Sequence, residues 1–314
     1  MRIKKVTGIL LAAVLTFSMA GCGAVSVDGE TSSNAGNSSE EASGSYEGSG
    51  AVGLAISTLN NPFFVTLSEG AQAAAEEQDV ELIVVDAGDD AAKQTNDIED
   101  LISRNISVLI VNPVDSDAVA PAVKDAVAKG IKVVSVDRVV NGVDVDCAIA
   151  SDNVAGAKAA TEYLISLVGE GAKVAELQGV SGASATIDRG EGFHQAADEN
   201  LDVVASQTAN FNRSEGMTVM ENMLQANADI QGVFAHNDEM ALGAVEAIGG
   251  KDIKVVGFDA TDDAVAAVAD GKMAATVAQK PDLMGATAVE TAVKLIAGET
   301  VDKEIPVEVE LVTE

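Results

Sequence analysis

The fold of this chain is decided by residues 55–65, which read AISTLNNPFFV. The apolar run just before the loop predicts a buried strand, and Pro62 stands where the first turn of a helix tolerates proline. The residues between them are therefore expected to form a strand-to-helix loop. In an open parallel sheet such loops gather at the carboxyl ends of the strands, where ligands bind. Hydroxyl and amide groups beside two adjacent phenylalanines suit a molecule with polar edges and C–H faces, such as a sugar.

The same stretch has a second explanation that involves no ligand. Phe63 and Phe64 could be ordinary core residues, and Asn61 could cap the helix, since asparagine is favoured at that position. This stretch alone leaves both explanations open. Similar loops later in the chain favour the ligand site.

Composition limits the fold and excludes one class of partner. A chain of 314 residues is long enough for two domains of ordinary size. Its formal net charge of -31 argues against nucleic-acid binding, because nucleic-acid phosphates would be repelled. We interpret the acidity as a source of solubility. Two cysteines, Cys22 and Cys147, form neither a disulfide framework nor a metal site, and Cys147 is expected to be a small buried apolar residue.

The first fifty residues resemble an export signal followed by a linker. Arg2, Lys4 and Lys5 precede an apolar stretch that ends at Gly21, which is typical of a secretory signal. The ending resembles a bacterial lipoprotein signal, which implies that residues 1–21 are removed and that Cys22 is lipidated. An ordinary secretory signal with an incidental cysteine is the alternative. Residues 22–50 are rich in Gly, Ser, Ala and Glu and predict a flexible acidic linker.

From Ala51 onward, apolar runs alternate with helical patterns. The expected strands are Ala51–Ser57, Glu81–Asp86, Val108–Asn112, Lys132–Asp137, Val145–Ser151, Lys173–Gln178, Val203–Gln207, Gly232–His236, Lys254–Phe258 and Ala275–Gln279. The clearest helices are Pro62–Gln78, Asp117–Lys129, Val154–Val168, Glu239–Ile248 and Leu283–Ala297. This alternation predicts an α/β fold of parallel sheets with helices on both faces. Ten strands suggest two similar sheets.

Polar groups follow several of these strands directly. They are Asn112, Asp137 with Arg138, Asn237, Asp259 and Gln279. Four of the seven phenylalanines fall at the same kind of position, namely Phe63, Phe64, Phe211 and Phe258. In a chain with 3% aromatic residues, core packing alone does not explain that bias.

Taken together, a series of motifs resembles the ribose-binding proteins of bacterial ABC importers, which have the type I periplasmic-binding-protein fold. The motifs are residues 57–64, Asn112-Pro113, Asp137-Arg138, Ser151-Asp152-Asn153, Glu176-Leu177-Gln178-Gly179, residues 189–193, residues 237–243 and Gly257-Phe258-Asp259. The resemblance covers nearly everything from Ala51 to Thr313. It implies two Rossmann-like domains with parallel sheets joined by a three-strand hinge, with crossings near Ser151-Asp152, Gln279-Lys280 and Glu308-Val309. The implied lobes are residues 51–151 plus 280–308 and residues 152–279 plus 309–314.

The resemblance also implies which residues bind the sugar. The first lobe would supply Ser57, Asn61, Phe63, Phe64, Asn112, Asp137, Arg138 and, near the hinge, Gln279. The second would supply Arg189, Phe211, Asn237, Phe258 and Asp259. Carboxylates accept from neighbouring hydroxyls and arginine donates a fork of N–H bonds, so these types suit vicinal diols. Taken singly, Asp137 and Arg138 could instead be a surface ion pair, and Asn237 a helix cap.

The function implied is that of a transport receptor. It would capture D-ribose between closing lobes and deliver it to the permease subunits of an ABC importer, as a monomer with no cofactor or metal. A chemoreceptor is a further candidate partner. Allose, xylose, a furanose or an autoinducer-2-like molecule are alternative ligands. A transcription regulator of the same fold would need a helix-turn-helix before the first strand, and an enzyme would need a nucleophile, metal cluster or cofactor loop; neither is found in the sequence.

Overall fold

The computed structural model describes residues 48–313. The expected signal, Cys22 and most of the expected linker lie outside this range. The strands are β1 (Val52–Ile56), β2 (Leu82–Asp86), β3 (Val108–Val111), β4 (Lys132–Val136), β5 (Cys147–Ser151), β6 (Lys173–Gln178), β7 (Asp202–Thr208), β8 (Gly232–Ala235), β9 (Lys254–Asp259), β10 (Ala275–Ala278), β11 (Glu304–Val307) and β12 (Glu310–Val312). The helices are α1 (Pro62–Glu77), α2 (Ala91–Ser103), α3 (Ala120–Ala128), α4 (Asn153–Val168), α5 (Ser184–Ala197), α6 (Arg213–Ala226), α7 (Asp238–Ile248), α8 (Asp262–Ala269) and α9 (Pro281–Ile296). Within this range no helix combines the length and the apolar character that a membrane span requires.

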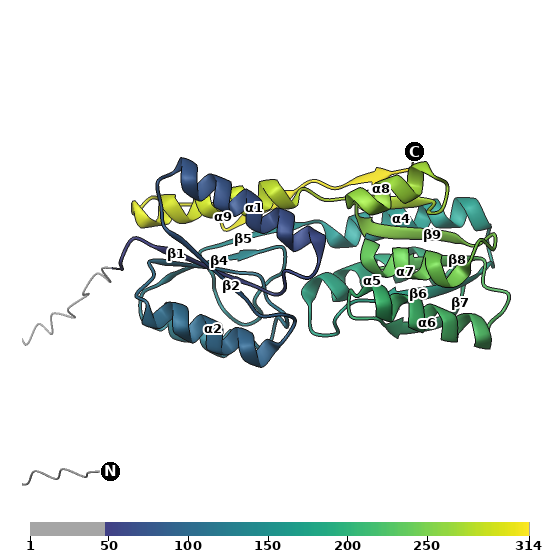
Figure 1. The fold of residues 1–314 in the computed structure, drawn as a ribbon, viewed down its shortest axis with the longest axis horizontal. Coiled ribbons are helices and arrows are strands. Elements are labelled where there is room, and N and C mark those ends of the chain that lie inside the picture. The colour runs from purple at the N-terminus through teal and green to yellow at the C-terminus, as the bar shows by residue number, and fades with distance from the viewer. Residues whose placement is uncertain (1–47, 314) are drawn as a thin grey trace, which may run out of the picture. The chain divides into compact units, whose positions relative to one another are not determined.

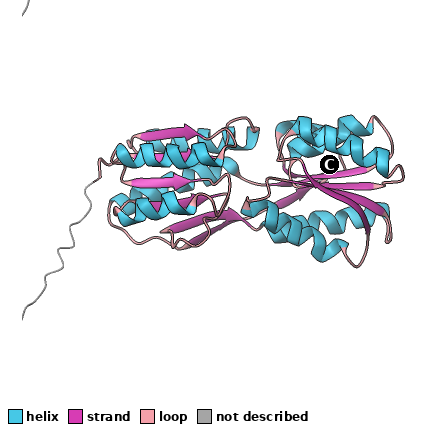
Figure 2. Ribbon diagram, turned by 90° about the horizontal axis from the view of Figure 1, so that it is seen from below, coloured by secondary structure: helices cyan, strands magenta, loops and turns pink. Residues whose placement is uncertain are grey.

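The strands form two sheets, as expected, and each sheet has six strands rather than the five that ten expected strands would give (Figure 2). The first has the order β11-β5-β4-β3-β1-β2 and is parallel throughout. The second has the order β12-β10-β9-β8-β6-β7 and is parallel except for β12, which runs antiparallel to β10. The two orders correspond strand for strand, so β4 and β9 occupy equivalent places.

Helices cover both faces of each sheet (Figure 1). In the first sheet, α1 and α9 share a core with one face, while α2 and α3 pack on the other. In the second, α4 and α5 pack on one face and α6, α7 and α8 on the other. The strands are apolar on both faces because both faces are buried, which is typical of parallel sheets.

The chain passes between the sheets three times. It leaves the first sheet after Ser151, returns after β10 near Gln279, and crosses again between β11 and β12. Neither β11 nor β12 was among the expected strands. Their alternating Val and Glu residues carry no landmark such as a long apolar run, since both strands lie at sheet edges and are partly exposed.

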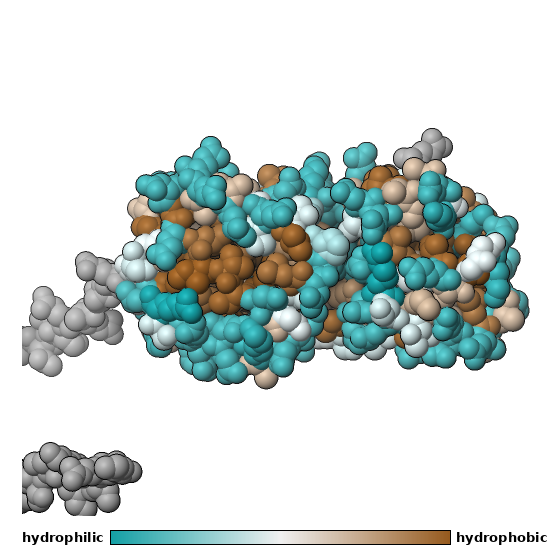
Figure 3. All heavy atoms as spheres, viewed as in Figure 1, coloured by the Kyte–Doolittle hydropathy of each residue, from teal (hydrophilic) through white to brown (hydrophobic). Residues whose placement is uncertain are grey.

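The edge strands farthest from β11 and β12, which are β2 and β7, differ in polarity. The edge strand β2 reads LIVVD and all five residues are half-buried. Hydrophobic side chains gather on the surface where Figure 1 places β2 (Figure 3). The equivalent edge β7 reads DVVASQT and exposes Asp202, Ser206 and Gln207. The first sheet therefore has the more apolar edge.

Candidate functional site

A small cavity lies between the carboxyl ends of strands from both sheets. Its accessible volume is about 10 Å³, room for about one water molecule, and it is lined by Asn61, Phe63, Phe64, Asp137, Arg138, Ala185, Arg189, Phe211, Asn237 and Asp259. Every lining residue except Ala185 was predicted from the sequence. The other predicted residues do not line it: Asn112 and Gln279 are hydrogen-bonded to Asp137 and Asp259, Phe258 contacts Arg189, and Ser57 is bonded to Asn112. The structure thus brings together side chains from loops far apart in the chain.

The first sheet contributes an aspartate and an arginine that are adjacent in sequence. Asp137 follows β4 in a left-handed backbone conformation, with φ of 64°. Its Oδ2 accepts a hydrogen bond from Nδ2 of Asn112 at 3.0 Å and lies 3.5 Å from Nε of Arg138. Arg138 also donates to the carbonyl oxygen of Pro113 at 2.8 Å. Both charged side chains are only 4% exposed, so the explanation of a surface ion pair is wrong.

The second sheet contributes an arginine and an aspartate from separate elements. Arg189, on α5, donates from Nε to Oδ1 of Asn153 at 2.8 Å and from Nη1 to the carbonyl oxygen of His236 at 2.6 Å. The same Nη1 lies 3.6 Å from Oδ1 of Asp259, at the end of β9. Gln279 donates to that Oδ1 at 2.8 Å. The guanidinium is thus fixed by several partners.

Gln279 belongs to the second sheet's half of the site rather than to the first. It directly follows β10 and its side chain supports Asp259, whose strand β9 is hydrogen-bonded to β10. The resemblance implied that it acts with the first lobe, near the hinge, although the implied boundaries place residue 279 in the second. Sequence position near a crossing does not show to which sheet a side chain belongs, whereas the hydrogen bond does.

Burial governs the charge state of the site. Burial raises the pKa of Asp137, and the neighbouring Arg138 and Arg189 oppose that rise. Burial also raises the pKa of Asp259 well above its usual value, with Arg189 again opposing it. For both carboxyl groups burial outweighs the arginines, so their pKa values stay raised while the guanidinium groups beside them supply hydrogen-bond donors.

Aromatic rings close the remaining walls. Phe63 and Phe64 meet edge to face with ring centroids 5.1 Å apart. The guanidinium of Arg138 lies 5.1 Å from the ring centroid of Phe64 and 5.3 Å from that of Phe211, within the range of a cation–π contact. Phe258 lies beneath Arg189, 3.9 Å from its guanidinium carbon, and supports the arginine without lining the cavity.

The two asparagines of the cavity are helix caps as well. Asn61 Oδ1 accepts from the backbone N–H of Phe63 at 2.9 Å at the start of α1. Asn237 Oδ1 accepts from the N–H of Met240 at 3.0 Å at the start of α7, and its Nδ2 donates to the carbonyl oxygen of Phe211 at 3.3 Å. The capping explanation is therefore correct for both, and it does not exclude the ligand site because both side chains also line the cavity.

Ala185 was missed because its side chain carries no chemical signal. It is buried near the start of α5 and offers only a methyl group to the cavity. Such a position can limit the size of a ligand without bonding to it. Only its place after the loop that follows β6, at the carboxyl end of a parallel strand, could have indicated it.

Direct hydrogen bonds join the loops of the two sheets beside the cavity. Ser116, after β3, donates from its N–H to the carbonyl oxygen of Gly182 at 2.9 Å. Its Oγ accepts from the N–H of Ser184 at 3.2 Å, and the Oγ of Ser184 accepts from the N–H of Val139 at 3.1 Å. We call Ser116, Gly182 and Ser184 the inter-sheet clasp. It holds the two halves of the cavity together through protein atoms alone.

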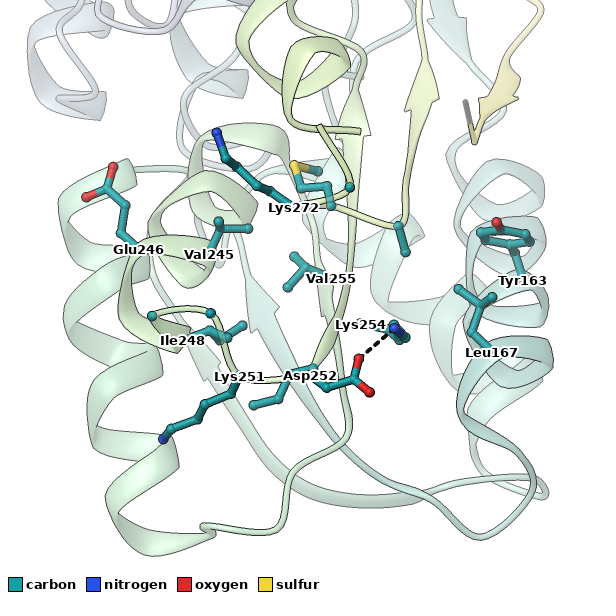
Figure 4. A pocket seen from close by; sticks show the side chains of 16 residues that line it. Tyr163, Leu167, Val245, Glu246, Ile248, Lys251, Asp252, Lys254, Val255 and Lys272 are labelled. Carbon is teal, nitrogen blue, oxygen red and sulfur yellow. Dashed lines mark hydrogen bonds and ion pairs between the residues drawn. The ribbon is translucent and has the colours of Figure 1, made fainter. Parts of the chain in front are cut away.

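A larger hollow at the far end of the second sheet has a different character. Its accessible volume is about 760 Å³, and it includes Lys254, which begins β9, whereas Asp259 at the cavity ends the same strand. Figure 4 shows its lysines around an open rim, with Lys254 paired to Asp252 at 2.7 Å. This hollow lies at the amino ends of the strands, whereas ligands of open parallel sheets bind at the carboxyl ends. Within residues 48–313 no group of three or more His, Cys, Asp or Glu side chains is arranged to hold a metal ion.

Comparison with known proteins identifies the family. The family model described as "Periplasmic binding protein domain" matches residues 52–300. The chain belongs to the periplasmic binding protein family. Its relatives among the periplasmic binding proteins include the ribose import binding protein RbsB of Bacillus subtilis (strain 168), 51% identical over 265 residues, with 84% of this chain and 87% of that protein covered. RbsB of Escherichia coli (strain K12) is 50% identical, covering 83% of this chain and 90% of that protein.

Solved periplasmic binding proteins share the fold. A solute binding protein from Bacillus halodurans C-125 with bound myo-inositol superimposes with a TM-score of 0.80 at 36% identity, covering 85% of this chain and 95% of that chain. One from Actinobacillus succinogenes 130z with bound D-allose has a TM-score of 0.78 at 30% identity, covering 84% and 97%. The fold is therefore the two-lobed α/β fold expected from the sequence.

Proposed function

We propose that this protein is the substrate-binding component of an ABC sugar importer and that it binds D-ribose between two lobes. The observation that carries the proposal is the cavity to which each sheet contributes one carboxylate and one guanidinium, Asp137 with Arg138 and Asp259 with Arg189. The two RbsB proteins at 50% and 51% identity support ribose as the sugar. Relatives of this kind are transport proteins, so we propose no enzymatic activity.

The residue types suit a small polyol. A carboxylate can accept from two neighbouring hydroxyls while an arginine donates to their oxygens, and phenylalanine rings cover the C–H faces of the sugar. The accessible volume of about 10 Å³ is far below the roughly 300–1,000 Å³ typical of ligand pockets, so a bound sugar requires the walls of this cavity to move apart. A monosaccharide is the class of ligand that fits the polarity of the lining.

Ribose binding would favour the closed arrangement. Residues 51–151 with 280–308 would form one lobe and residues 152–279 with 309–314 the other, and only the closed form completes the hydrogen bonds to the sugar from both sides. The permease would then recognise the closed form, with a chemoreceptor as a further candidate partner. We propose that the protein acts as a monomer.

Titration calorimetry with a panel of sugars tests the ligand. We expect D-ribose to bind at micromolar affinity or tighter, about −8 kcal/mol or more favourable. D-Allose, xylose, myo-inositol and furanose sugars serve as competitors, since solved relatives contain D-allose and myo-inositol. Heat with one of these and none with ribose would reject the ribose assignment while leaving sugar transport in place.

The proposed location is the outer side of the cell membrane, with a lipid on Cys22. The basic and apolar residues before Cys22 support this, as does the acidic linker that follows. Expression of the full chain with a labelled fatty acid should place label on the protein, and Cys22→Ala should abolish it and release the protein from membranes. An unlabelled wild-type chain would leave an ordinary secretory signal as the better explanation.

A further inference from the structure

The backbone that carries Asp259 is strained. Asp259 has φ of 128° and the next residue, Ala260, has φ of 54°, both in the region that residues with a side chain rarely adopt. Two such residues in succession persist only where the surroundings hold them. The turn that they form connects β9 to the cap of α8, and it aims the Asp259 carboxylate at Gln279 and Arg189.

A buried carboxylate outside the cavity holds this turn. Asp238, the first residue of α7, is fully buried, and its Oδ2 accepts from the backbone N–H of Thr261 at 2.8 Å and from the Thr261 hydroxyl at 3.2 Å. Its Oδ1 accepts from the hydroxyl of Thr276 at 2.6 Å. The same Thr276 oxygen accepts from the backbone N–H of Ala260 at 3.2 Å. Both backbone N–H groups after Asp259 are therefore satisfied by Asp238 and Thr276.

The neighbouring strand leaves room for this carboxylate. A Cβ atom on Gly257 would lie 2.3 Å from Oδ1 of Asp238, closer than real Cβ atoms approach another heavy atom. Thr276 is fully buried in β10, the strand next to β9. The glycine, the aspartate and the threonine thus come from three adjacent elements and meet at one point.

We propose that Asp238 and Thr276 are positioning residues that fix the Asp259 carboxylate for sugar binding. They do not line the cavity. They act through the turn after Asp259, because they accept hydrogen bonds from its two backbone N–H groups and so hold it in the strained conformation. The Asp259 carboxylate therefore points into the cavity before the sugar binds. The proposal rests on the proposed function for its ligand, and its structural part can be tested without a ligand.

Three threonine variants separate positioning from general stability. Thr276→Val removes the hydroxyl and keeps the shape, Thr276→Ser keeps the hydroxyl, and Thr161→Val is a matched control. Thr161 is also fully buried, and its hydroxyl donates to the carbonyl oxygen of Ala157 within α4 at 2.8 Å. Each variant is measured by calorimetry with D-ribose, by urea unfolding, and by amide hydrogen exchange at Ala260 and Thr261.

We expect Thr276→Val to weaken ribose binding at least tenfold and to speed exchange at Ala260 and Thr261 at least tenfold. Thr276→Ser should stay within about threefold of the wild type in both, and Thr161→Val should lose stability without losing affinity.

If Thr276→Val does not fold, Thr261→Val, at a half-buried position, removes only the bond at 3.2 Å and should weaken ribose binding about threefold. The proposal would be overturned if Thr276→Val exchanged its amide hydrogens and bound ribose as the wild type does. If Thr276→Val is unfolded, the same result in Thr261→Val would overturn it. A wild-type protein that binds no ribose would instead reject the proposed ligand, while the exchange rates would still test the positioning.

Discussion

The two sheets build their halves of the site from equivalent strands but by different means. Because the sheet orders correspond, β4 and β9 occupy the same place, and each ends at an aspartate with positive φ, Asp137 and Asp259. In the first half the arginine is the next residue, Arg138, and Asn112 on the adjacent strand completes the group. In the second half the arginine comes from a helix instead. The topology fixes where a carboxylate lies, and the local sequence decides what accompanies it.

This difference makes the second half more dependent on its partners. Arg189 is bonded to Asn153 at the start of α4, to the carbonyl of His236 after β8 and to Asp259 at the end of β9. His236 is itself fixed by a neighbour, because its ring Nε2 lies 2.8 Å from Oε1 of the buried Glu176. Arg138 has one hydrogen bond to Pro113, and its Nε is a buried atom without a hydrogen-bond partner. Several elements must therefore agree to place Arg189, whereas Arg138 is placed largely by its own loop.

The largest effect should come from removing Arg189. Arg189→Met leaves the buried Asp259 and Asn153 without their cationic partner, and we expect ribose affinity to fall by about 2–5 kcal/mol. Arg138→Met should cost less, at the low end of that range, because fewer protein groups lose a partner. Calorimetry on both variants measures the difference. An equal or larger loss in Arg138→Met would show that the two halves contribute alike.

The same contrast explains what the sequence could predict. Asp137 and Arg138 stand together after an apolar run, so their place at the end of a buried strand could be predicted from a few residues, and the alternation of runs was enough to predict two sheets. Three features depend on contacts between distant elements: the side of the site to which Gln279 belongs, the methyl group of Ala185, and the support of Asp259 by Asp238 and Thr276. A short apolar or hydroxyl side chain carries no signal of its own until the fold shows what it touches. The strands β11 and β12 were missed for the related reason that they are short, four and three residues, and contain only one buried residue between them.

The inter-sheet clasp should give the next largest effect. Ser116→Ala leaves the N–H of Ser184 without its acceptor at the point where the two halves meet, and a buried unsatisfied donor costs about 1–3 kcal/mol. We expect ribose affinity to fall by a similar free energy, because only the closed arrangement buries the unsatisfied N–H of Ser184. Ser166→Ala, which removes a hydroxyl that bonds within α4 on an exposed surface, is the matched control. Unchanged affinity in Ser116→Ala would show that the clasp does not bias closure.

A smaller effect should appear in the pH dependence of stability, to which Asp238 of the second half contributes without a counterpart in the first. Burial raises the pKa of Asp238, which lies shortly after β8, from 3.8 to about 7. The strand equivalent to β8 in the first sheet is β3, and the residues that follow it, Asn112, Pro113 and Val114, are not acidic. Between those two values the folded state holds a proton that the unfolded state has lost. The free energy of unfolding should therefore fall as the pH rises toward 7, by at most about 1.4 kcal/mol per pH unit, and level off above it.

Urea unfolding between pH 5.5 and 8 measures this slope. Asp238→Asn cannot ionise and should flatten it by the share that Asp238 contributes. Burial also raises the pKa of Asp137 and of Asp259, so a slope of the same sign should remain in that variant. A wild-type stability that rises with pH across this range would contradict the assignment of a protonated Asp238.

The smallest effect is expected at Ser57, because the equivalent position of the second half is a glycine and has no side chain. Ser57 follows β1, and the residue after the equivalent strand β6 is Gly179. The Ser57 hydroxyl is fully buried and has no hydrogen-bond partner, and the residue does not line the cavity; its backbone N–H donates to Asn112 at 3.1 Å instead. Since a buried unpaired hydroxyl is unfavourable, Ser57→Ala should leave the protein as stable or more stable by up to about 1 kcal/mol. Ribose affinity should stay within about twofold, because the backbone bond that positions Asn112 survives. A tenfold loss by calorimetry would instead show that the hydroxyl turns toward the sugar on binding, and would restore Ser57 to the residues that contact it.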